Sequence, residues 1–558
     1  MSGGYFAIGV WHFAPVRRLG SSPPPHFTID AFPPGLWGYQ SVSFLVLATF
    51  AFGLFCLSPY DSSWRSKAAL LPSEVLNVQE SMSAGERKLV VVLPVNEPSN
   101  DLCRLVASAV ALGYPAPVIV NWNEQYQNDE NGLGPSHLSK VTGVHDFLSW
   151  ATGDDVSDGE RLAEDDLVLV MDAQDIWMQL GPDVLLQRYY SVNARANQRL
   201  ADKYGSASAA LMKQTTIVSA QKGCVAPRNR ISNLNCDAVP QSPLPADVYG
   251  LFTDTAFMHG KYLRPRYVNS GGFMGPAGDM RRYFQRVRER MDEHILDIRS
   301  WEDLGGDQGI FAEIYGEQEV WRQKADYEGL LCTDDGGNVA EAGMEAYEYH
   351  IGLDYEQEMF YPTCNSEVDG TWVHVHDAEH LAEQSSEAGV RPPRIRGLPE
   401  DIAQAVGPLA KLDDDELSGR TWGDVALYAD FWTTSIPVAI HHNAYRKGIK
   451  SRRKTWWDRT WYFPHLRNLL EAQVASKSTE PLFRTEAADG ILVVRPYGPL
   501  AAPEPLLFET DKQSGLSGLR ATSWNSVCRS KDDNVEAQSP WYDEVFRDGR
   551  GTFRADFG

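Results

Sequence analysis

Residues 167–175 read Leu167-Val168-Leu169-Val170-Met171-Asp172-Ala173-Gln174-Asp175, an apolar run that passes directly into two carboxylates. Five consecutive apolar residues are typical of a strand buried on both faces of a parallel sheet. Asp172 and Asp175 would then follow the carboxyl end of that strand, where α/β sheets bind their ligands. Carboxylates at this spacing can converge on Mg²⁺ or Mn²⁺, although an isolated pair is more commonly a surface turn or a helix cap.

Similar patterns precede this stretch. Residues 89–93 and 117–120 are β-branched runs that predict two further strands. Residues 101–112 and 137–151 have the patterns of helices and lie between the strands. Strands that alternate with helices at this spacing predict an α/β fold with a mostly parallel sheet.

The charge balance excludes one broad class of function. The 558 residues include 75 acidic and 51 basic side chains, a formal net charge of −24. A general nucleic-acid-binding protein needs a basic surface to replace the counterions around phosphate. We therefore expect no nucleic-acid partner, and the acidity is compatible with carboxylate-rich cation sites.

One segment near the N-terminus has the composition of a membrane anchor. Residues 41–57 carry no charge, and the preceding residues 36–39 have an interfacial character, which together approach the ~20 residues of a membrane-spanning helix. We predict an N-terminal tail at 1–36, an uncleaved signal-anchor helix at 37–58 and a polar stem at 59–87. A buried core helix is the alternative, and the flanking basic residues barely favour either orientation.

The cysteines are compatible with an oxidising compartment. None of the seven forms a CxxC pair, which argues against a zinc ribbon. Cys224 and Cys236 bracket a short loop and are the pair that we expect to form a disulfide. Free buried thiols are the alternative.

The remaining chain divides by composition. We assign residues 88–475 to the main domain, because apolar patterns recur through most of this range. Residues 377–420 are rich in Glu, Ser, Pro and Asp, which predicts a surface insertion within that domain. Residues 476–558 contain no recognisable motif and are predicted to form a C-terminal tail.

Four further motifs follow the acidic pair. Residues 267–275 read as a strand that enters a glycine-rich turn. Residues 305–309 (GGDQG) precede an apolar helical stretch, and residues 351–354 (IGLD) and 440–443 (IHHN) come later. Taken singly, each of these motifs has a structural explanation as a turn, a cap, a strand end or a buried histidine.

The order of these motifs resembles the glycosyltransferase domain of the procollagen lysyl hydroxylase family, over roughly residues 88–450. That domain has an Asp-x-x-Asp after a strand, then Asn-Ser-Gly-Gly-Phe-Ile-Gly, Asp-Asp-Gln, Leu-Asp and His-Gly-Asn. The corresponding stretches here are Asp172 with Asp175, Asn269 to Gly275, Asp307-Gln308, Leu353-Asp354, and His441 with Asn443. Residues 220–224 (AQKGC) also resemble an Ala-Glu-x-x-Cys segment of the family.

The resemblance implies a Rossmann-like fold of the GT-A type, a UDP-sugar donor, and Mn²⁺ as the metal, with Mg²⁺ as a possible substitute. It implies a lumenal catalytic domain in the endoplasmic reticulum or Golgi, acting on a protein or glycan acceptor. Asp172, Asp175 and His441 would ligate the metal, and Asp307 would face the reacting centre. The implied substrate-binding residues are Asn269, Ser270, Gly271, Gly272, Gln308, Lys140, Asn443 and Lys447, with the two lysines near the diphosphate.

Several positions depart from the family pattern. Gly306 replaces the first of its paired acids, Gln221 replaces a glutamate, and His442 replaces a glycine. A catalytically inactive relative that binds a nucleotide sugar or scaffolds partners is therefore the alternative function. A phosphohydrolase is a further alternative, but it would require two adjacent metals. Residues 374–377 (HVHD) do not supply the spaced iron motif of the family's oxygenase domain, which we do not expect in this chain.

A basic and aromatic block follows the proposed metal histidine. It comprises Arg446, Lys447, Lys450, Arg452, Arg453, Lys454, Trp456, Trp457, Trp461 and Tyr462. The block could close over a diphosphate and present aromatic faces to a sugar. The alternative is a solvated cationic surface beside a core helix.

Overall fold

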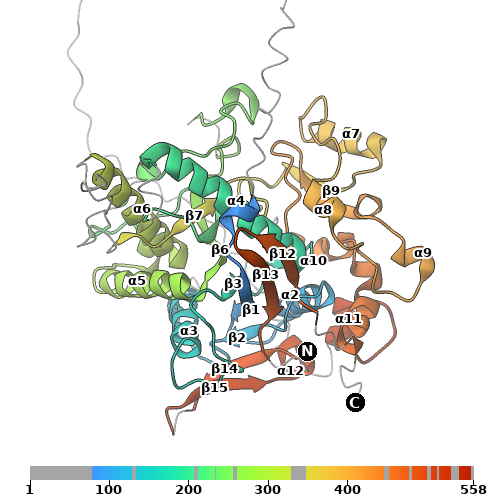
Figure 1. Ribbon diagram of the computed structural model, residues 1–558, viewed down its shortest axis with the longest axis horizontal. Helices are drawn as coiled ribbons and strands as arrows, with labels where there is room; N and C mark the ends of the chain where they lie inside the picture. The colour runs from blue at the N-terminus through green and yellow to red at the C-terminus, as the bar shows by residue number, and fades with distance from the viewer. Residues whose placement is uncertain are drawn as a thin grey trace, which may run out of the picture. The chain divides into compact units, whose positions relative to one another are not determined.

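A ten-stranded sheet lies at the centre of the computed structural model (Figure 1). The structure describes residues 78–128, 134–205, 211–232, 234, 236–255, 260–327, 347–444, 451–476, 480–498, 504–511, 514–529 and 540–553. The described residues all fall within the compact unit Val75–Gly558. The predicted anchor at 37–58 lies outside them, and none of the described helices is long and apolar enough to cross a membrane.

The main path of the sheet has the order β15-β14-β2-β1-β3-β6-β5-β7. The strands on this path are β15 (Ser517–Ala521), β14 (Leu506–Thr510), β2 (Val118–Val120), β1 (Gly85–Pro94), β3 (Leu167–Met171), β6 (Tyr267–Pro276), β5 (Thr216–Gln221) and β7 (Ile351–Asp354). Beside the first half of β1 lies β13 (Gly490–Pro496), which also pairs with β12 (Phe483–Ala487). The strands predicted at 89–93, 117–120 and 167–171 are therefore confirmed.

The centre of this sheet is parallel. β1 runs parallel to β2, β3 and β13, and the pairs β2–β14 and β5–β7 are also parallel. β6 runs antiparallel to both of its neighbours, as do β12 and β15 to theirs. The fold is thus mixed α/β with a large, mostly parallel central sheet, which is compatible with a Rossmann-like fold.

The strand predicted from residue 267 is confirmed, but the predicted glycine-rich turn is wrong, because β6 continues through the glycines as one strand. Opposite β5, Val218 pairs with Phe273 and Ser219 with Asn269, so residues 270–272 bulge out of this ladder. A bulge keeps the strand in the sheet while it re-aims the residues that it contains.

Helices cover both faces of the sheet (Figure 1). Val90 and Val92 of β1 pack with side chains of α3 (Pro135–Ala151), α5 (Ala277–Ile295) and α6 (Gly306–Tyr327). Leu89, Val91 and Leu93 pack with α2 (Asn100–Ala111), α4 (Pro182–Tyr204) and α11 (Leu466–Ala475). This alternation follows from the two-residue period of a strand and explains why the run is apolar throughout. The helices predicted at 101–112 and 137–151 are confirmed.

Two small sheets extend one face. The three-stranded sheet has the order β4-β11-β8, with β4 at Ile176–Met178, β11 at Ala439–His441 and β8 at Phe360–Pro362. The other pairs β9 (Gly370–His374) with β10 (Ala426–Asp430).

Segment 377–420 contains α7 (Ala378–Glu387), α8 (Glu400–Gln404) and α9 (Asp415–Ser418). Its apolar residues Leu381, Val390, Ile395, Ile402 and Leu409 are buried in the main core. The segment is therefore anchored by apolar contacts as well as lying on the surface.

The predicted C-terminal tail is part of the fold. Residues 476–558 supply β12 to β15 of the central sheet, together with α12 (Trp524–Cys528) and α13 (Trp541–Val545). Cys528 forms a disulfide with Cys103 of α2, a pair that the sequence did not predict. The predicted disulfide between Cys224 and Cys236 is confirmed.

Candidate metal centre

A short turn between two strands positions the acidic pair. β3 ends at Met171, and β4 begins at Ile176, so Asp172 and Asp175 occupy the two ends of the connection. The backbone N–H of Asp172 donates to the carbonyl oxygen of Gly271 at 2.9 Å, which continues the β3–β6 pairing by one residue. Both carboxylates therefore leave the carboxyl edge of the sheet, as the sequence predicts.

Strand pairing brings His441 to this turn. His441 of β11 is the ladder partner of Ile176, the residue directly after Asp175. The next residue, His442, donates its backbone N–H to the carbonyl oxygen of Asp175 at 2.7 Å. The small sheet thus fixes the imidazole beside the second carboxylate, although the two lie far apart in the sequence.

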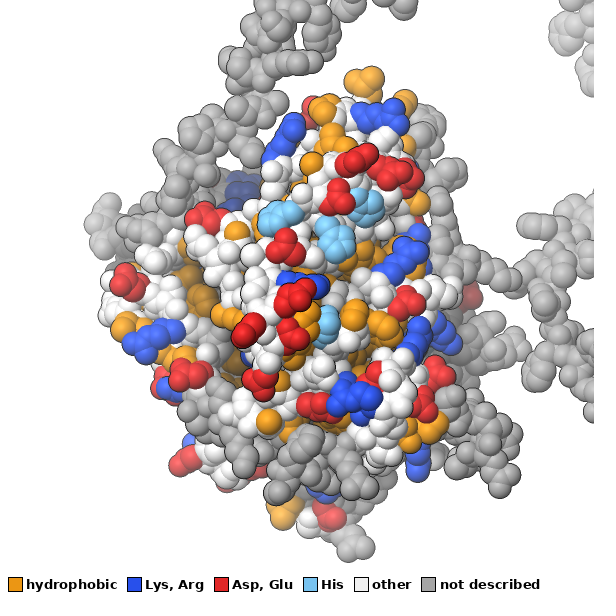
Figure 2. Space-filling model, turned by 90° about the vertical axis from the view of Figure 1, so that its right-hand side faces the viewer, with side chains coloured by type: hydrophobic (Ala, Val, Ile, Leu, Met, Phe, Trp, Pro, Cys, Tyr) orange, Lys and Arg blue, Asp and Glu red, His pale blue; other side chains and the backbone are white. Residues whose placement is uncertain are grey.

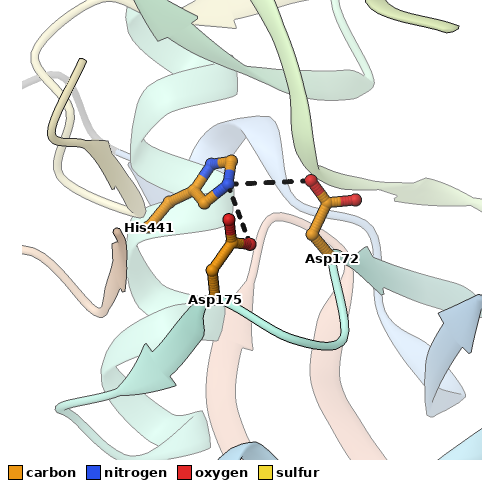
Figure 3. Close-up of side chains that lie close together, drawn as sticks. All are labelled: Asp172, Asp175 and His441. Atoms are coloured by element: carbon orange, nitrogen blue, oxygen red, sulfur yellow. Dashed lines mark ion pairs between the residues drawn. The ribbon is translucent and has the colours of Figure 1, made fainter. Parts of the chain in front are cut away.

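The side chains of Asp172, Asp175 and His441 point toward one another (Figure 3). Nε2 of His441 lies 3.2 Å from Oδ1 of Asp175 and 3.6 Å from Oδ2 of Asp172. One ligand atom from each residue lies within 4.8 Å of the other two. Adjacent ligands around a divalent cation, each about 2.1 Å from the ion, are ~3 Å apart, so the group could hold such an ion with little movement.

The burial of the three side chains is uneven. The side chains of His441 and Asp175 are 6% and 10% exposed, whereas that of Asp172 is 29% exposed. An ion held here would therefore be shielded from solvent on the β11 side and accessible to solvent on the Asp172 side. Open coordination positions are what a metal needs in order to bind a substrate as well as the protein.

Hydrogen bonds fix which nitrogen of His441 faces the carboxylates. Nδ1 of His441 lies 3.0 Å from Oδ1 of Asn269. The amide nitrogen of Asn269 donates instead to Oε1 of Gln221 at 2.8 Å and to Oε1 of Gln308 at 3.2 Å. Because Asn269 Oδ1 can only accept, the neutral imidazole carries its proton on Nδ1 and presents the Nε2 lone pair to a metal.

The glycine at 271 allows this arrangement. A Cβ atom on Gly271 would lie 2.3 Å from Cε1 and Nδ1 of His441, closer than any side chain tolerates. The backbone of β6 can therefore approach the imidazole only where residue 271 has no side chain. Gly272 is similarly constrained, since its Cβ would lie 2.6 Å from the ring of Phe360.

Lys140 of α3 links the metal triad to Asp307. Its Nζ lies 2.6 Å from Oδ1 of Asp172, 2.7 Å from Oδ2 of Asp307 and 2.7 Å from the carbonyl oxygen of Ser270. Burial alone would lower the pKa of Lys140, but the carboxylates of Asp172 and Asp307 outweigh it and raise that pKa. Lys140 is therefore charged, and all three of its N–H groups have acceptors within the protein.

The local charges leave room for a divalent cation. Burial raises the pKa of Asp172, as do the nearby carboxylates of Asp175 and Asp307, whereas Lys140 and His441 act in the opposite direction. With all three carboxylates ionised, Lys140 compensates one negative charge and two remain. A divalent ion would balance them and relieve the repulsion among the acids.

The other predicted substrate-binding residues have structural contacts around the triad. Oε1 of Gln308, in the first turn of α6, also lies 3.4 Å from the backbone N–H of Ser270. Asn443 accepts from the backbone N–H of Cys364 through Oδ1 at 3.1 Å. Lys447 lies outside the described residues. Substrate binding by these residues stays a prediction.

The aromatic block beyond His441 belongs largely to the core. Trp457, Trp461 and Tyr462 are buried in the main cluster, so their faces are not open to a sugar. Trp177 packs against the ring of His442 at 4.1 Å. Burial lowers the pKa of His442 to about 3, so this ring is neutral and acts as a packing group.

Two supporting features were not predicted. Gln221, identified only as a departure from the family pattern, holds the amide of Asn269. The strands β4 and β8 that flank His441 are each three residues long. The apolar run Ile176-Trp177-Met178 is a sequence signal for β4, and β8 has no comparable signal.

A cavity of about 620 Å³ lies elsewhere, between α2, the start of α4 and α11, and no residue of the triad lines it.

Comparison of the chain with protein-family models and with curated proteins finds no match. The fold and the site therefore define the chain only as a mixed α/β protein with a candidate divalent-metal centre at the carboxyl edge of its sheet.

Proposed function

We propose that this chain is a metal-dependent glycosyltransferase that uses a UDP-sugar donor. The observation that carries the proposal is the convergence of Asp172, Asp175 and His441 at the carboxyl edge of a mostly parallel sheet. Ligands of α/β sheets bind at this edge, and a metal held there can bind a diphosphate.

The donor set fits Mn²⁺ better than an ion that accepts oxygen ligands alone. Two carboxylates and one imidazole are a mixed oxygen and nitrogen set, which Mn²⁺ accepts and which Mg²⁺ accepts less readily. When bound, the ion would stabilise the negative charge of the departing UDP. Asp172, the most exposed of the three ligands, would lie on the side from which the diphosphate enters.

Asp307 is the proposed group at the reacting centre. It lies in the first turn of α6 and contacts the same ammonium group of Lys140 as Asp172 does, so one cation holds both carboxylates. Asp307 would act as a base toward the acceptor or stabilise positive charge that develops on the sugar. Through its ion pair with Asp307, Lys140 would fix the distance of that carboxylate from the metal.

The predicted location of the chain belongs to the same proposal. Two disulfides, Cys103–Cys528 and Cys224–Cys236, are typical of proteins that fold in an oxidising compartment. We propose that a signal anchor at 37–58 holds the catalytic domain in the lumen of the endoplasmic reticulum or Golgi.

The purified full-length chain tests the proposal. A panel of UDP-sugars is screened with and without Mn²⁺ for an increase in Tm, and the sugars that bind are then assayed for release of UDP. We expect one donor to raise Tm and to release UDP only with Mn²⁺. Asp175→Asn should reduce the release at least about 100-fold, whereas the exposed control Asp165→Asn should leave it unchanged.

Other outcomes distinguish the alternatives. A donor that raises Tm without release of UDP would favour the catalytically inactive relative. Two metal ions that both depend on the Asp172 turn would favour a phosphohydrolase. No effect of any UDP-sugar on Tm would overturn the proposal.

A further inference from the structure

Histidine side chains gather at the end of β9 and the start of α7, on elements that do not contribute to the metal triad. The stretch 374–377 contains His374 and His376, and His380 follows in the first turn of α7. Figure 2 shows histidine side chains together with acidic ones on the surface that forms the right-hand side of Figure 1. We propose that His374 and His376, with His380 beside them, form a second metal site, one for a transition-metal ion such as Zn²⁺.

Asp424 orients both of the first two imidazoles. Nδ1 of His374 lies 3.1 Å from the carbonyl oxygen of Asp424, and Nδ1 of His376 lies 3.1 Å from its Oδ1. A carbonyl and a carboxylate only accept hydrogen bonds, so each neutral ring carries its proton on Nδ1. Each Nε2 then has a free lone pair, and proteins orient metal-binding histidines by this same contact.

The position of Asp424 is itself fixed. Its Oδ2 accepts from the backbone N–H of Thr421 at 3.0 Å and from the Thr421 hydroxyl at 2.6 Å. The backbone N–H of His376 also lies 3.3 Å from the carbonyl oxygen of Gly423. These hydrogen bonds therefore connect the segment before β10 to the turn after β9, and Asp424 contacts both histidines.

A third ligand is available from α7. Asp377 caps this helix by accepting from the backbone N–H of His380 at 3.0 Å. His380 therefore lies in the first turn of α7, four residues after His376, and the exposed carboxylates of Asp377 and Glu379 lie between the two histidines in the sequence. Three imidazoles with few carboxylates suit Zn²⁺, Cu²⁺ or Ni²⁺, whereas the oxygen-rich Asp172 site suits Mn²⁺.

An ion would have to draw the three imidazoles together, because their ligand atoms do not all lie within 4.8 Å of one another in the structure. Within the described part of the chain, only Asp172, Asp175 and His441 already lie within 4.8 Å of one another. The His376 side chain is 58% exposed, and His374 is also exposed. Side chains at the surface change rotamer within nanoseconds, so His380 can bring its ring to an ion held by the oriented rings of His374 and His376.

The experiment separates the two metal sites. Zn²⁺ is titrated by calorimetry into the full-length chain that carries Asp172→Asn and Asp175→Asn, which removes the first proposed site. We expect one Zn²⁺ to bind to this variant.

Substitution of the two oriented histidines supplies the decisive comparison. His374→Gln with His376→Gln should weaken Zn²⁺ binding at least about tenfold. His465→Gln removes an imidazole from the separate segment Phe463–His465 and should change nothing. Far-UV circular dichroism and Tm without Zn²⁺ should match between the variants, since the two substituted side chains are exposed. Failure of the Asp172→Asn, Asp175→Asn chain to bind Zn²⁺, or unchanged binding after the double histidine substitution, would overturn this inference and leave the proposed transferase site unaffected.

Discussion

At the scale of single residues, the orientation of one imidazole decides whether the acidic pair can hold a metal. Asn269 accepts from Nδ1 of His441, and Gln221 and Gln308 hold the Asn269 amide so that its oxygen faces the ring. The Nε2 lone pair is therefore aimed at the carboxylates before any ion binds. Such preorganisation stabilises the bound metal, because the ligand loses little freedom when the ion arrives.

Replacement of Asn269 by leucine tests this role. The Asn269→Leu variant keeps the approximate volume but cannot hold Nδ1–H, so the imidazole loses its fixed tautomer. We expect the affinity for Mn²⁺ to fall about 10- to 100-fold, as measured by calorimetric titration. An affinity equal to that of the unsubstituted chain would show that Asn269 does not orient the ligand.

Lys140 is expected to stabilise the fold as well as the site. The Lys140→Met variant leaves Asp172 and Asp307 without their shared cation, and breaking a buried ion pair from one side costs about 3 kcal/mol. The free energy of urea unfolding without metal should fall by that order, and Mn²⁺ should restore part of it. Lys203→Met, at an exposed position of α4, is the control. Equal losses with and without Mn²⁺ would contradict the link to the metal site.

At the scale of elements, two short pairings build the centre. The bulge in β6 takes residues 270–272 out of the ladder with β5 and brings Gly271 against His441. The three-residue strand β11 then places His441 opposite β4. A shift of one residue in this register would turn His441 away from the carboxylates, because successive side chains of a strand point to opposite faces.

Asp354 shapes the loop that leads into the small sheet. This buried carboxylate ends β7 and accepts backbone N–H groups from Glu358, Met359 and Phe360. Burial raises the pKa of Asp354 to about 7, despite the hydrogen bonds that favour the ionised form. In the unfolded chain the same carboxyl has a pKa of about 3.9.

The resulting pH dependence has a definite sign. Between about pH 4 and 7 the folded chain holds a proton on Asp354 that the unfolded chain has released, so this group's contribution to stability falls as pH rises. The full change is on the order of 4 kcal/mol. We expect the loss of unfolding free energy from pH 4 to pH 8 to be smaller in Asp354→Asn than in the unsubstituted chain. Urea denaturation at several pH values in this range measures the unfolding free energy, with the exposed Asp158→Asn as control. A loss from pH 4 to pH 8 that is equal in Asp354→Asn and the unsubstituted chain would contradict the raised pKa of Asp354.

At the scale of the whole molecule, the C-terminal region completes the domain. β13 pairs with the first half of β1, and β14 extends the sheet beyond β2. Buried side chains from this region enter the main core: Leu492, Val494, Leu507, Trp524, Val527, Cys528, Trp541, Val545, Phe546 and Phe553. The sheet would lose four strands without it and would expose the apolar faces that they cover.

A chain that ends at residue 475 is therefore expected not to fold. This truncation removes β12 to β15, which leaves unpaired edges on β1 and β2 and exposes the main core to solvent. We expect the truncated chain to aggregate or to be digested at once in limited proteolysis. A soluble product with the circular dichroism of the full chain would show that the domain is complete at 475.

The local patterns of the sequence determined the first three strands, the helices between them and the position of the acidic pair after β3. These features follow from apolar periods that extend over a few neighbouring residues, and such periods are visible in one dimension. The proximity of His441 to that pair was expected only from the order of motifs shared with a transferase family.

The tertiary structure alone decided the rest of the site. The bulge in β6, the position of Lys140 between two carboxylates and the contribution of residues 476–558 to the sheet were not predicted. Each depends on which distant segments pair and in what register. Strand pairing depends on contacts between distant segments across the whole core, so no local sequence pattern specifies it.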